Sequence, residues 1–257
     1  MAIPALKNGT KILAPLGLVA LLVAIWWVAV TTSRSLIFPT PAQVVLGIAE
    51  LVQQGLLLKH VLASLFRVTL GYLLAAVLAI PFGILLGWFS AAHVAFNPLI
   101  QLLRPISPIA WIPLAILWFG VGDSSPIFLI FLSSFFPMVV ATTAGVHTIE
   151  RQYLLAAQNF GVAGLKLWRV VIFLAALPQI IVGMRVGLGV AWLVVVAAEM
   201  IAINSGLGFL IIDSRNAGNR YDLVLAGMAI IGAIGLLMDS LMRRLERLDV
   251  VRWRYGH

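Results

Sequence analysis

The chain has 257 residues, of which 62% are hydrophobic and only 10% are charged. Because soluble domains carry about 25% charged residues, this composition argues against a soluble protein and indicates an integral membrane protein. The net charge of +8 is spread between apolar runs, which argues against a nucleic-acid binder, and the absence of cysteine excludes disulfides and thiolate chemistry.

Charged residues bracket the apolar runs and predict six membrane-spanning helices. A charge at the centre of a bilayer costs at least about 2.5–3.5 kcal/mol, so each span is expected to lie between charges. The first run is too long for the core of a signal peptide and is interpreted as an uncleaved span. The predicted spans are about 12–33, 62–89, 98–120, 126–147, 175–199 and 222–240.

Residues 40–58 follow the first span and predict an amphipathic helix on the outer surface. Pro39 and Pro41 flank the first residue of this segment, and apolar residues then repeat at helical spacing. The repeat consists of Val44, Val45, Ile48, Leu51 and Val52.

The second and third spans contain residues that shape helices. Asn97 and Pro98 favour a turn, and so predict the boundary between the two spans. Small residues in the second span allow a neighbouring helix to approach closely; they are Gly71, Gly83 and Gly87. Prolines are expected to bend the third span; they are Pro105, Pro108 and Pro113.

Basic residues near the span ends predict the orientation, because cytoplasmic loops carry an excess of Lys and Arg. With both termini in the cytoplasm, ten basic residues lie inside: Lys7, Lys11, Arg151, Lys166, Arg169, Arg243, Arg244, Arg247, Arg252 and Arg254. Five lie outside: Arg34, Lys59, Arg67, Arg215 and Arg220. This orientation makes residues 150–170 a cytoplasmic loop.

Most of that loop belongs to the stretch LAAQNFGVAGLKLWRVVIFLAALP, which covers residues 155–178. Small side chains in it predict a short helical hairpin that another protein can approach closely; they are Ala156, Ala157, Gly161 and Gly164. Lys166 and Arg169 flank the hairpin as interfacial anchors. An ordinary cytoplasmic loop is the alternative, and composition alone does not decide between the two.

The stretch resembles the E-A-A-x-x-x-G-x9-I-x-L-P loop of ABC-transporter permeases, which docks on the ATP-binding subunit. Ala156 and Ala157 match the two alanines, Gly161 matches the glycine, and Val171 matches the isoleucine. The sequence departs from the pattern at two positions. Leu155 replaces the glutamate and Leu174 replaces the first proline, although Pro178 matches a second proline found in one subfamily.

Further segments resemble the permeases for nitrate, sulfonates, taurine and bicarbonate. They include FPTPAQV, RPISPIAWIPLAILWFGVGDSS, GMRVGLGVAWLVVVAAEM and SGLGFLI, in the order and spacing of that subfamily. The resemblance covers nearly the whole chain. It implies one all-α permease domain over residues 1–257, with the six-span fold of type I ABC importers, similar to the methionine and molybdate permeases.

The resemblance also implies the partners. We expect a second copy of the chain, two cytoplasmic ATP-binding subunits seated on the 150–170 loops, and an external substrate-binding protein. The chain itself would hold no cofactor and catalyse no reaction, because ATP and Mg would be bound by the partner subunits. The assembly would sit in the bilayer of a bacterial inner membrane and import a small anion, nitrate first, with bicarbonate, taurine or an alkanesulfonate as the other candidates.

The fifth span carries the candidate residues of the translocation pathway. Residues spaced by 4, 3, 4 and 3 share one face of a helix; they are Arg185, Gly189, Trp192, Val196 and Glu199. One interpretation is that this stripe draws an anion inward. The alternative is that Arg185 holds an internal ion pair and Glu199 caps the interface. In the third span, Trp111 and Arg104 are weaker candidates, for which packing and headgroup anchoring are the alternatives.

The sequence lacks the motifs of other function classes. The sequence has no glycine-rich nucleotide loop, no HExxH motif and no metal-ligand cluster, so the energy for transport is expected to come from a partner. An ion-coupled secondary transporter is the alternative. It would need carboxylates in mid-span, whereas Glu199, Asp222 and Asp239 lie near span ends.

Overall fold

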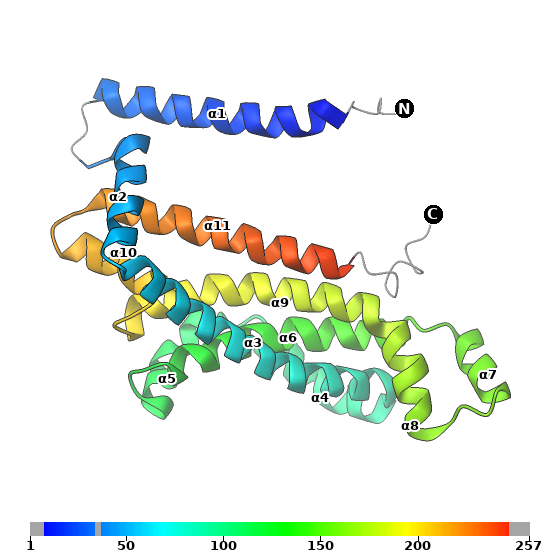
Figure 1. Cartoon of the computed structure of the whole chain (residues 1–257). Helices are drawn as coiled ribbons and strands as arrows, with labels where there is room; N and C mark the ends of the chain where they lie inside the picture. The colour runs from blue at the N-terminus through cyan, green and yellow to red at the C-terminus, as the bar shows by residue number, and fades with distance from the viewer. Residues whose placement is uncertain (1–7, 34–36, 247–257) are drawn as a thin grey trace. The chain divides into compact units, whose positions relative to one another are not determined.

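The computed structural model describes residues 8–33 and 37–246, and all regular structure in these ranges is helical (Figure 1). This confirms the predicted all-α class. The α-helices are α1 Asn8–Ser33, α2 Pro41–Gln53, α3 Leu56–Trp88, α4 Ser90–Leu103, α5 Ile112–Phe119, α6 Ser124–His147, α7 Arg151–Asn159, α8 Gly164–Leu167, α9 Phe173–Ala202, α10 Leu207–Asn216 and α11 Tyr221–Glu246. A 3-10 turn, η1 Pro108–Trp111, precedes α5, and a π-helical turn, η2 Trp168–Ile172, precedes α9.

Five helices of the described chain are long and apolar enough to cross a membrane. They cover Leu13–Ser33, Leu56–Trp88, Ser124–His147, Gly164–Ile201 and Tyr221–Glu246. A sixth crossing is obtained when α4 and the η1–α5 segment are taken as one broken span, whose two halves are bent by 86°. Of the basic residues used for orientation, several lie outside the described residues: Lys7, Arg34, Arg247, Arg252 and Arg254.

The boundary between the second and third spans lies elsewhere than the sequence predicts. Asn97 and Pro98 were expected to mark a turn there, but both lie inside α4, which already begins at Ser90. The bend predicted within the third span follows Leu103, where Pro105 and Pro108 come three residues apart. A single proline is tolerated within a membrane helix when neighbours satisfy the freed carbonyl. Two prolines in close succession remove two backbone donors and end the helix.

The helix that contains the fifth span begins before the predicted start of that span. Pro178 lies inside α9, and the helix runs back through η2 to Gly164. A π-helical turn adds a residue to the helical repeat without breaking it. The predicted cytoplasmic loop, residues 150–170, therefore leads into the helix of the fifth span without an intervening break.

The chain divides into two compact units, Met1–Leu58 with Leu210–Ala229 and Lys59–Phe209 with Ile230–His257. In the first unit, Thr40 and Gln43 form a capping box at the start of α2. Arg220 binds Glu50 of α2 at 2.6 Å, and this hydrogen bond lowers the pKa of Glu50. Within the predicted amphipathic stripe, Val44 and Leu51 are buried whereas Val45 and Val52 are exposed.

The second unit is held together by closely packed helices, with α9 lying along α6. A Cβ atom on Gly183 of α9 would lie 2.5 Å from the Cβ of Ala141. A Cβ on Gly83 of α3 would lie 2.6 Å from the Cβ of Thr142. Such distances leave no room for a side chain, so these glycines set the separation of the helices. This confirms the close approach predicted for Gly83.

Candidate functional site

The predicted cytoplasmic hairpin is formed by α7, a tight turn and α8. Gly161 follows the end of α7 with φ of +72°, and Gly164 opens α8 with φ of +57°. The amide of Val162 donates to the carbonyl of Ala157, and that of Gly161 donates to Gln158, both at 2.9 Å. This pair of bonds is a Schellman motif with glycine at its left-handed position. The motif explains why residue 161 is a glycine.

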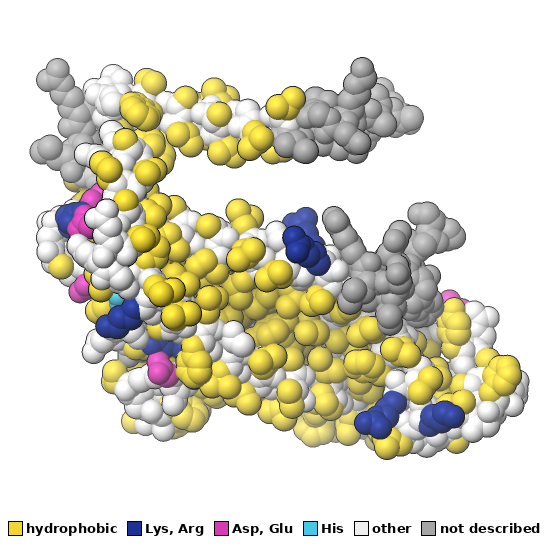
Figure 2. Space-filling view, in the orientation of Figure 1, with side chains coloured by type: hydrophobic (Ala, Val, Ile, Leu, Met, Phe, Trp, Pro, Cys, Tyr) yellow, Lys and Arg dark blue, Asp and Glu magenta, His cyan; other side chains and the backbone are white. Residues whose placement is uncertain are grey.

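The hairpin presents an apolar surface beside basic residues (Figure 2). Phe160 is 85% exposed at its tip, and Leu155 is also exposed. A groove of about 460 Å³ runs beside the tip, lined by Tyr153, Ala156, Ala157, Phe160, Val162, Val170, Val171, Leu174 and Ala175. Lys166 and Arg169 are exposed. Ala156 and Ala157 thus lie in the groove, and so does Leu174, one of the two departures from the permease pattern.

Three residues of the predicted pathway stripe line one cavity in the second unit. Arg185, Gly189 and Trp192 of α9 face a cavity of about 640 Å³ whose other wall is α11. The Trp192 indole donates to the carbonyl of Ile231 at 3.1 Å, which fixes the ring. A Cβ on Gly189 would meet nothing within 4 Å among residues 8–33 and 37–246, so this glycine leaves space open toward the cavity.

Arg185 is ion-paired within this cavity. Its Nε lies 2.8 Å from Asp239 Oδ1, and its Nη1 lies 3.2 Å from Glu246 Oε1. Asp239 also pairs with Arg243 at 2.8 Å. The Arg185 side chain keeps 31% of its surface exposed. Both interpretations of Arg185 therefore have a structural basis, because the residue is an ion-pair partner that still faces open space.

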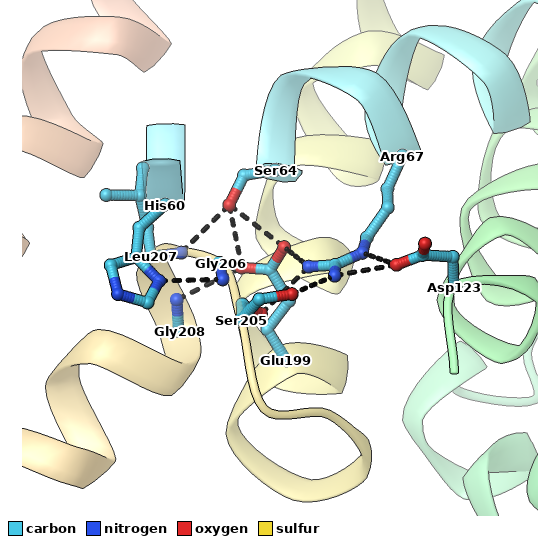
Figure 3. A network of polar contacts seen from close by, with 9 residues as sticks. All are labelled: His60, Ser64, Arg67, Asp123, Glu199, Ser205, Gly206, Leu207 and Gly208. Atoms are coloured by element: carbon cyan, nitrogen blue, oxygen red, sulfur yellow. Dashed lines mark hydrogen bonds and ion pairs between the residues drawn. The ribbon is translucent and has the colours of Figure 1, made fainter. Parts of the chain in front are cut away.

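Glu199 does not share this cavity. Its side chain is fully buried, and its carboxylate accepts hydrogen bonds from Arg67 at 2.6 Å and from Ser64 at 2.8 and 2.9 Å (Figure 3). The amide of Gly208 donates to the same carboxylate at 3.1 Å. The expectation that Glu199 caps the interface is wrong, because the side chain is enclosed by α3 and by the turn that follows α9.

Arg67 is the residue that the sequence interpretation missed. It was assigned to the outer surface as an orienting charge, yet only 2% of its side chain is exposed. Besides Glu199, it binds Asp123 at 2.7 Å and the carbonyl of Ser205 at 2.9 Å. It therefore joins α3 to α9, to the segment before α6 and to the segment before α10.

Two further residues of α3 belong to the same network. The amide of Gly206 donates to His60 Nδ1 at 3.0 Å, and the amide of Leu207 donates to Ser64 Oγ at 2.9 Å. His60, Ser64 and Arg67 are separated by 4 and 3 residues, so they share one face of α3. This polar spacing inside an apolar helix is the signal in the sequence that could have revealed the network.

The glycines of SGLGFLI are also explained by this network. Gly206 has φ of +105°, and a Cβ on it would overlap the Glu199 carboxylate. A Cβ on Gly208 would overlap the carbonyl of Val196. Only glycine lets this backbone approach the buried carboxylate closely enough to donate to it.

Trp111 and Arg104 lie away from the Arg185 cavity. Trp111 ends η1, packs against the cluster around Ile112 and Leu129, and has its ring 6.5 Å from that of Trp118. Arg104 follows α4 and is exposed. The contacts of Trp111 agree with the packing alternative. In residues 8–33 and 37–246, no group of three His, Cys, Asp or Glu side chains could hold a metal ion.

Comparison with known proteins places the chain in a family. Residues 79–248 match the model of the binding-protein-dependent transport system inner membrane component. The chain is 37% identical to the taurine transport system permease protein TauC of Escherichia coli, over 90% of this chain and 86% of that one. It is also 37% identical to the putative aliphatic sulfonates transport permease protein SsuC of Bacillus subtilis, over 93% and 86% of the two chains.

A third relative is the nitrate import permease protein NrtB of Synechocystis, 32% identical over 93% of this chain and 90% of that one. Among solved structures, an inward-facing MetNI methionine ABC transporter superposes with a TM-score of 0.66, at 16% identity over 75% of this chain and 95% of that one. This likeness supports the type I importer fold. The chain belongs to the family of binding-protein-dependent inner-membrane transport components and is a non-catalytic, multi-pass ABC permease subunit whose partner subunits hydrolyse ATP.

Proposed function

We propose that two copies of this chain form the translocation pathway of an importer for a small anion with a sulfonate or nitrate group. The observation that carries the proposal is the 37% identity with the taurine permease over 90% of this chain. The relatives named for aliphatic sulfonates and nitrate support the same class of solute. Nitrate, which the sequence analysis put first, is one member of this class beside taurine and alkanesulfonates.

The hairpin of α7 and α8 is proposed as the docking element for a cytoplasmic ATP-binding subunit. Its exposed Phe160 and the apolar groove beside it offer a surface that a cleft can enclose. Leu155 adds an exposed apolar side chain where the family pattern has glutamate, so an apolar contact replaces a charged one there. Because the hairpin continues directly into α9, movement of the docked subunit would be passed to the pathway residues on that helix.

The rest of the assembly follows from the same proposal. One chain supplies half of a two-fold pathway, so a second copy completes it, and an external substrate-binding protein delivers the solute. The partner subunits bind ATP and Mg, and this chain holds no cofactor. Both termini lie in the cytoplasm. Alternating access then requires that nucleotide-driven closure of the ATPases shifts the balance between inward-open and outward-open states.

A solute screen of the reconstituted transporter tests this proposal. The permease, its ATPase and its binding protein are placed in proteoliposomes with Mg-ATP. Taurine, an alkanesulfonate, nitrate and bicarbonate are added in turn, with a neutral sugar as the control. We expect one of the sulfonate or nitrate solutes to stimulate ATPase activity and to accumulate inside. Stimulation by the sugar alone, or uptake driven by an ion gradient without ATP, would contradict the proposal.

Replacing Arg185 with alanine separates the two interpretations of that residue. Hydrogen bonds to charged groups contribute about 1.5–3 kcal/mol, so loss of a solute contact should lower solute-stimulated ATPase activity about tenfold. The stability should fall by less than about 1 kcal/mol, since the ion pairs of Arg185 are partly exposed. Arg243→Ala is the matched control, because Arg243 also pairs with Asp239 but does not line the cavity. Dissociation of the Arg185→Ala complex would show that the residue is purely structural.

A further inference from the structure

A second polar cavity lies between α4 and α6. It measures about 310 Å³ and is lined by His93, Asn97 and Gln101 on α4 and by Thr143 and His147 on α6, among apolar side chains. Within each helix these polar residues are spaced by four, so each set lies on one helical face. Polar side chains between two membrane helices carry a free-energy cost, and such residues typically have a function.

The two histidines meet across this cavity. The ring centroids of His93 and His147 are 5.0 Å apart, with an angle of 65° between the planes. His93 Nδ1 is buried and has no hydrogen-bond partner among the described residues. A buried nitrogen without a partner is unfavourable unless a ligand satisfies it.

The chemistry of the lining favours a metal cation over an anion. The described residues around the cavity include no Lys or Arg that could balance an anion. A neutral imidazole offers a lone pair, and amide oxygens accept as well. Imidazole nitrogen is a preferred ligand of Zn²⁺, Ni²⁺ and Cu²⁺.

The separation of the rings also fits a shared ion. With metal–nitrogen bonds of about 2.0–2.1 Å, two imidazoles on one tetrahedral ion hold their ring centres about 5 Å apart. The observed 5.0 Å agrees with this value before any side chain moves. Because the described residues that line the cavity include two imidazoles, amide oxygens and water would complete the coordination.

We propose that His93 and His147 bind one divalent transition-metal ion, which links α4 to α6. This cavity shares no lining residue with the cavity around Arg185, so the proposed metal site is separate from that cavity. A bound ion would hold two helices together that belong to the third and fourth spans, and would restrain their relative movement.

Calorimetric titration with Ni²⁺ alone tests the site. The full chain is prepared in detergent, free of metal and without a polyhistidine tag. We expect saturable binding of one Ni²⁺ per chain. Loss of an outer-sphere partner already weakens metal sites by about 10–100-fold, so His93→Gln and His147→Gln, which each remove a ligand, should weaken binding at least about tenfold.

Two controls make the result decisive. His257→Gln removes a histidine of the C-terminal tail and should leave Ni²⁺ binding unchanged. His147 is exposed at the end of α6, so His147→Gln should fold like the natural chain, which thermal unfolding without metal can verify. The proposal is overturned if the natural chain binds no Ni²⁺, if either His93→Gln or His147→Gln binds it unchanged, or if His257→Gln abolishes binding.

Discussion

Replacing Arg67 with leucine is expected to lower the free energy of unfolding by about 3–5 kcal/mol, because the substitution leaves a buried carboxylate without its charged partner. Glu199 is fully buried, and its hydrogen bond from Arg67 is 2.6 Å long. Ser64 and the amide of Gly208 would remain as donors, but neither carries a charge. Chemical unfolding in mixed micelles, followed by tryptophan fluorescence, would measure the loss.

Two further variants isolate the buried pair. Arg67→Leu combined with Glu199→Leu removes both charges and should recover much of the lost stability, since apolar replacements of buried pairs are often neutral or stabilising. Asp123→Asn breaks the other ion pair of Arg67. Because the Asp123 side chain is 56% exposed, the free energy of unfolding should change by no more than about 1 kcal/mol. An Arg67→Leu loss no larger than that of Asp123→Asn would show that the buried pair contributes little.

Replacing Gly161 with glutamate is expected to uncouple ATP hydrolysis from uptake. Residue 161 has φ of +72°, and a side chain there costs about 1–2 kcal/mol. If this strain is relieved by opening the turn, the population with the docking conformation falls about 5- to 30-fold. The new carboxylate also places a negative charge beside the apolar groove. Uptake and ATPase activity, measured together in proteoliposomes, should show uptake reduced more than hydrolysis.

Asparagine at the same position is the matched control. Asn adopts left-handed backbone more readily than other residues with a side chain, so Gly161→Asn should keep most of the uptake. A Cβ at residue 161 would meet no described residue within 4 Å, so a defect would not come from a clash with the described part of the chain. If Gly161→Glu takes up solute at the rate of the natural chain, the docking role of the hairpin is refuted.

The helices were largely predictable because charge placement and hydrophobic length are local properties of the sequence. The boundary between the second and third spans was not, because several prolines lie within one apolar segment. Pro98, which was expected to mark that boundary, is accommodated inside α4, whereas Pro105 and Pro108 lie at the bend predicted for the third span. Which proline ends a helix depends on whether neighbouring helices satisfy the freed carbonyl, and this is a tertiary property.

In the candidate site too, local features were predictable from the sequence, whereas contacts between distant residues were not. Gly161 lies in a local turn between α7 and α8, so the spacing of the small residues around it was enough to predict the hairpin. The partner of Glu199 could not be predicted, because Arg67 lies 132 residues away in the sequence and resembles an orienting charge at a span end. Likewise, the sequence placed Arg185 on a helical face but did not show that Asp239 and Glu246 face it.

The long separation of Arg67 and Glu199 has a consequence for biogenesis. At synthesis rates of about 5–20 residues per second, the 132 residues between them take roughly 7–26 s to make. During that time α3 carries an arginine whose final partner does not yet exist. Asp123 follows Arg67 by only 56 residues, so it is made in less than half that time. The half-exposed aspartate is therefore positioned to neutralise Arg67 while the nascent chain waits for α9.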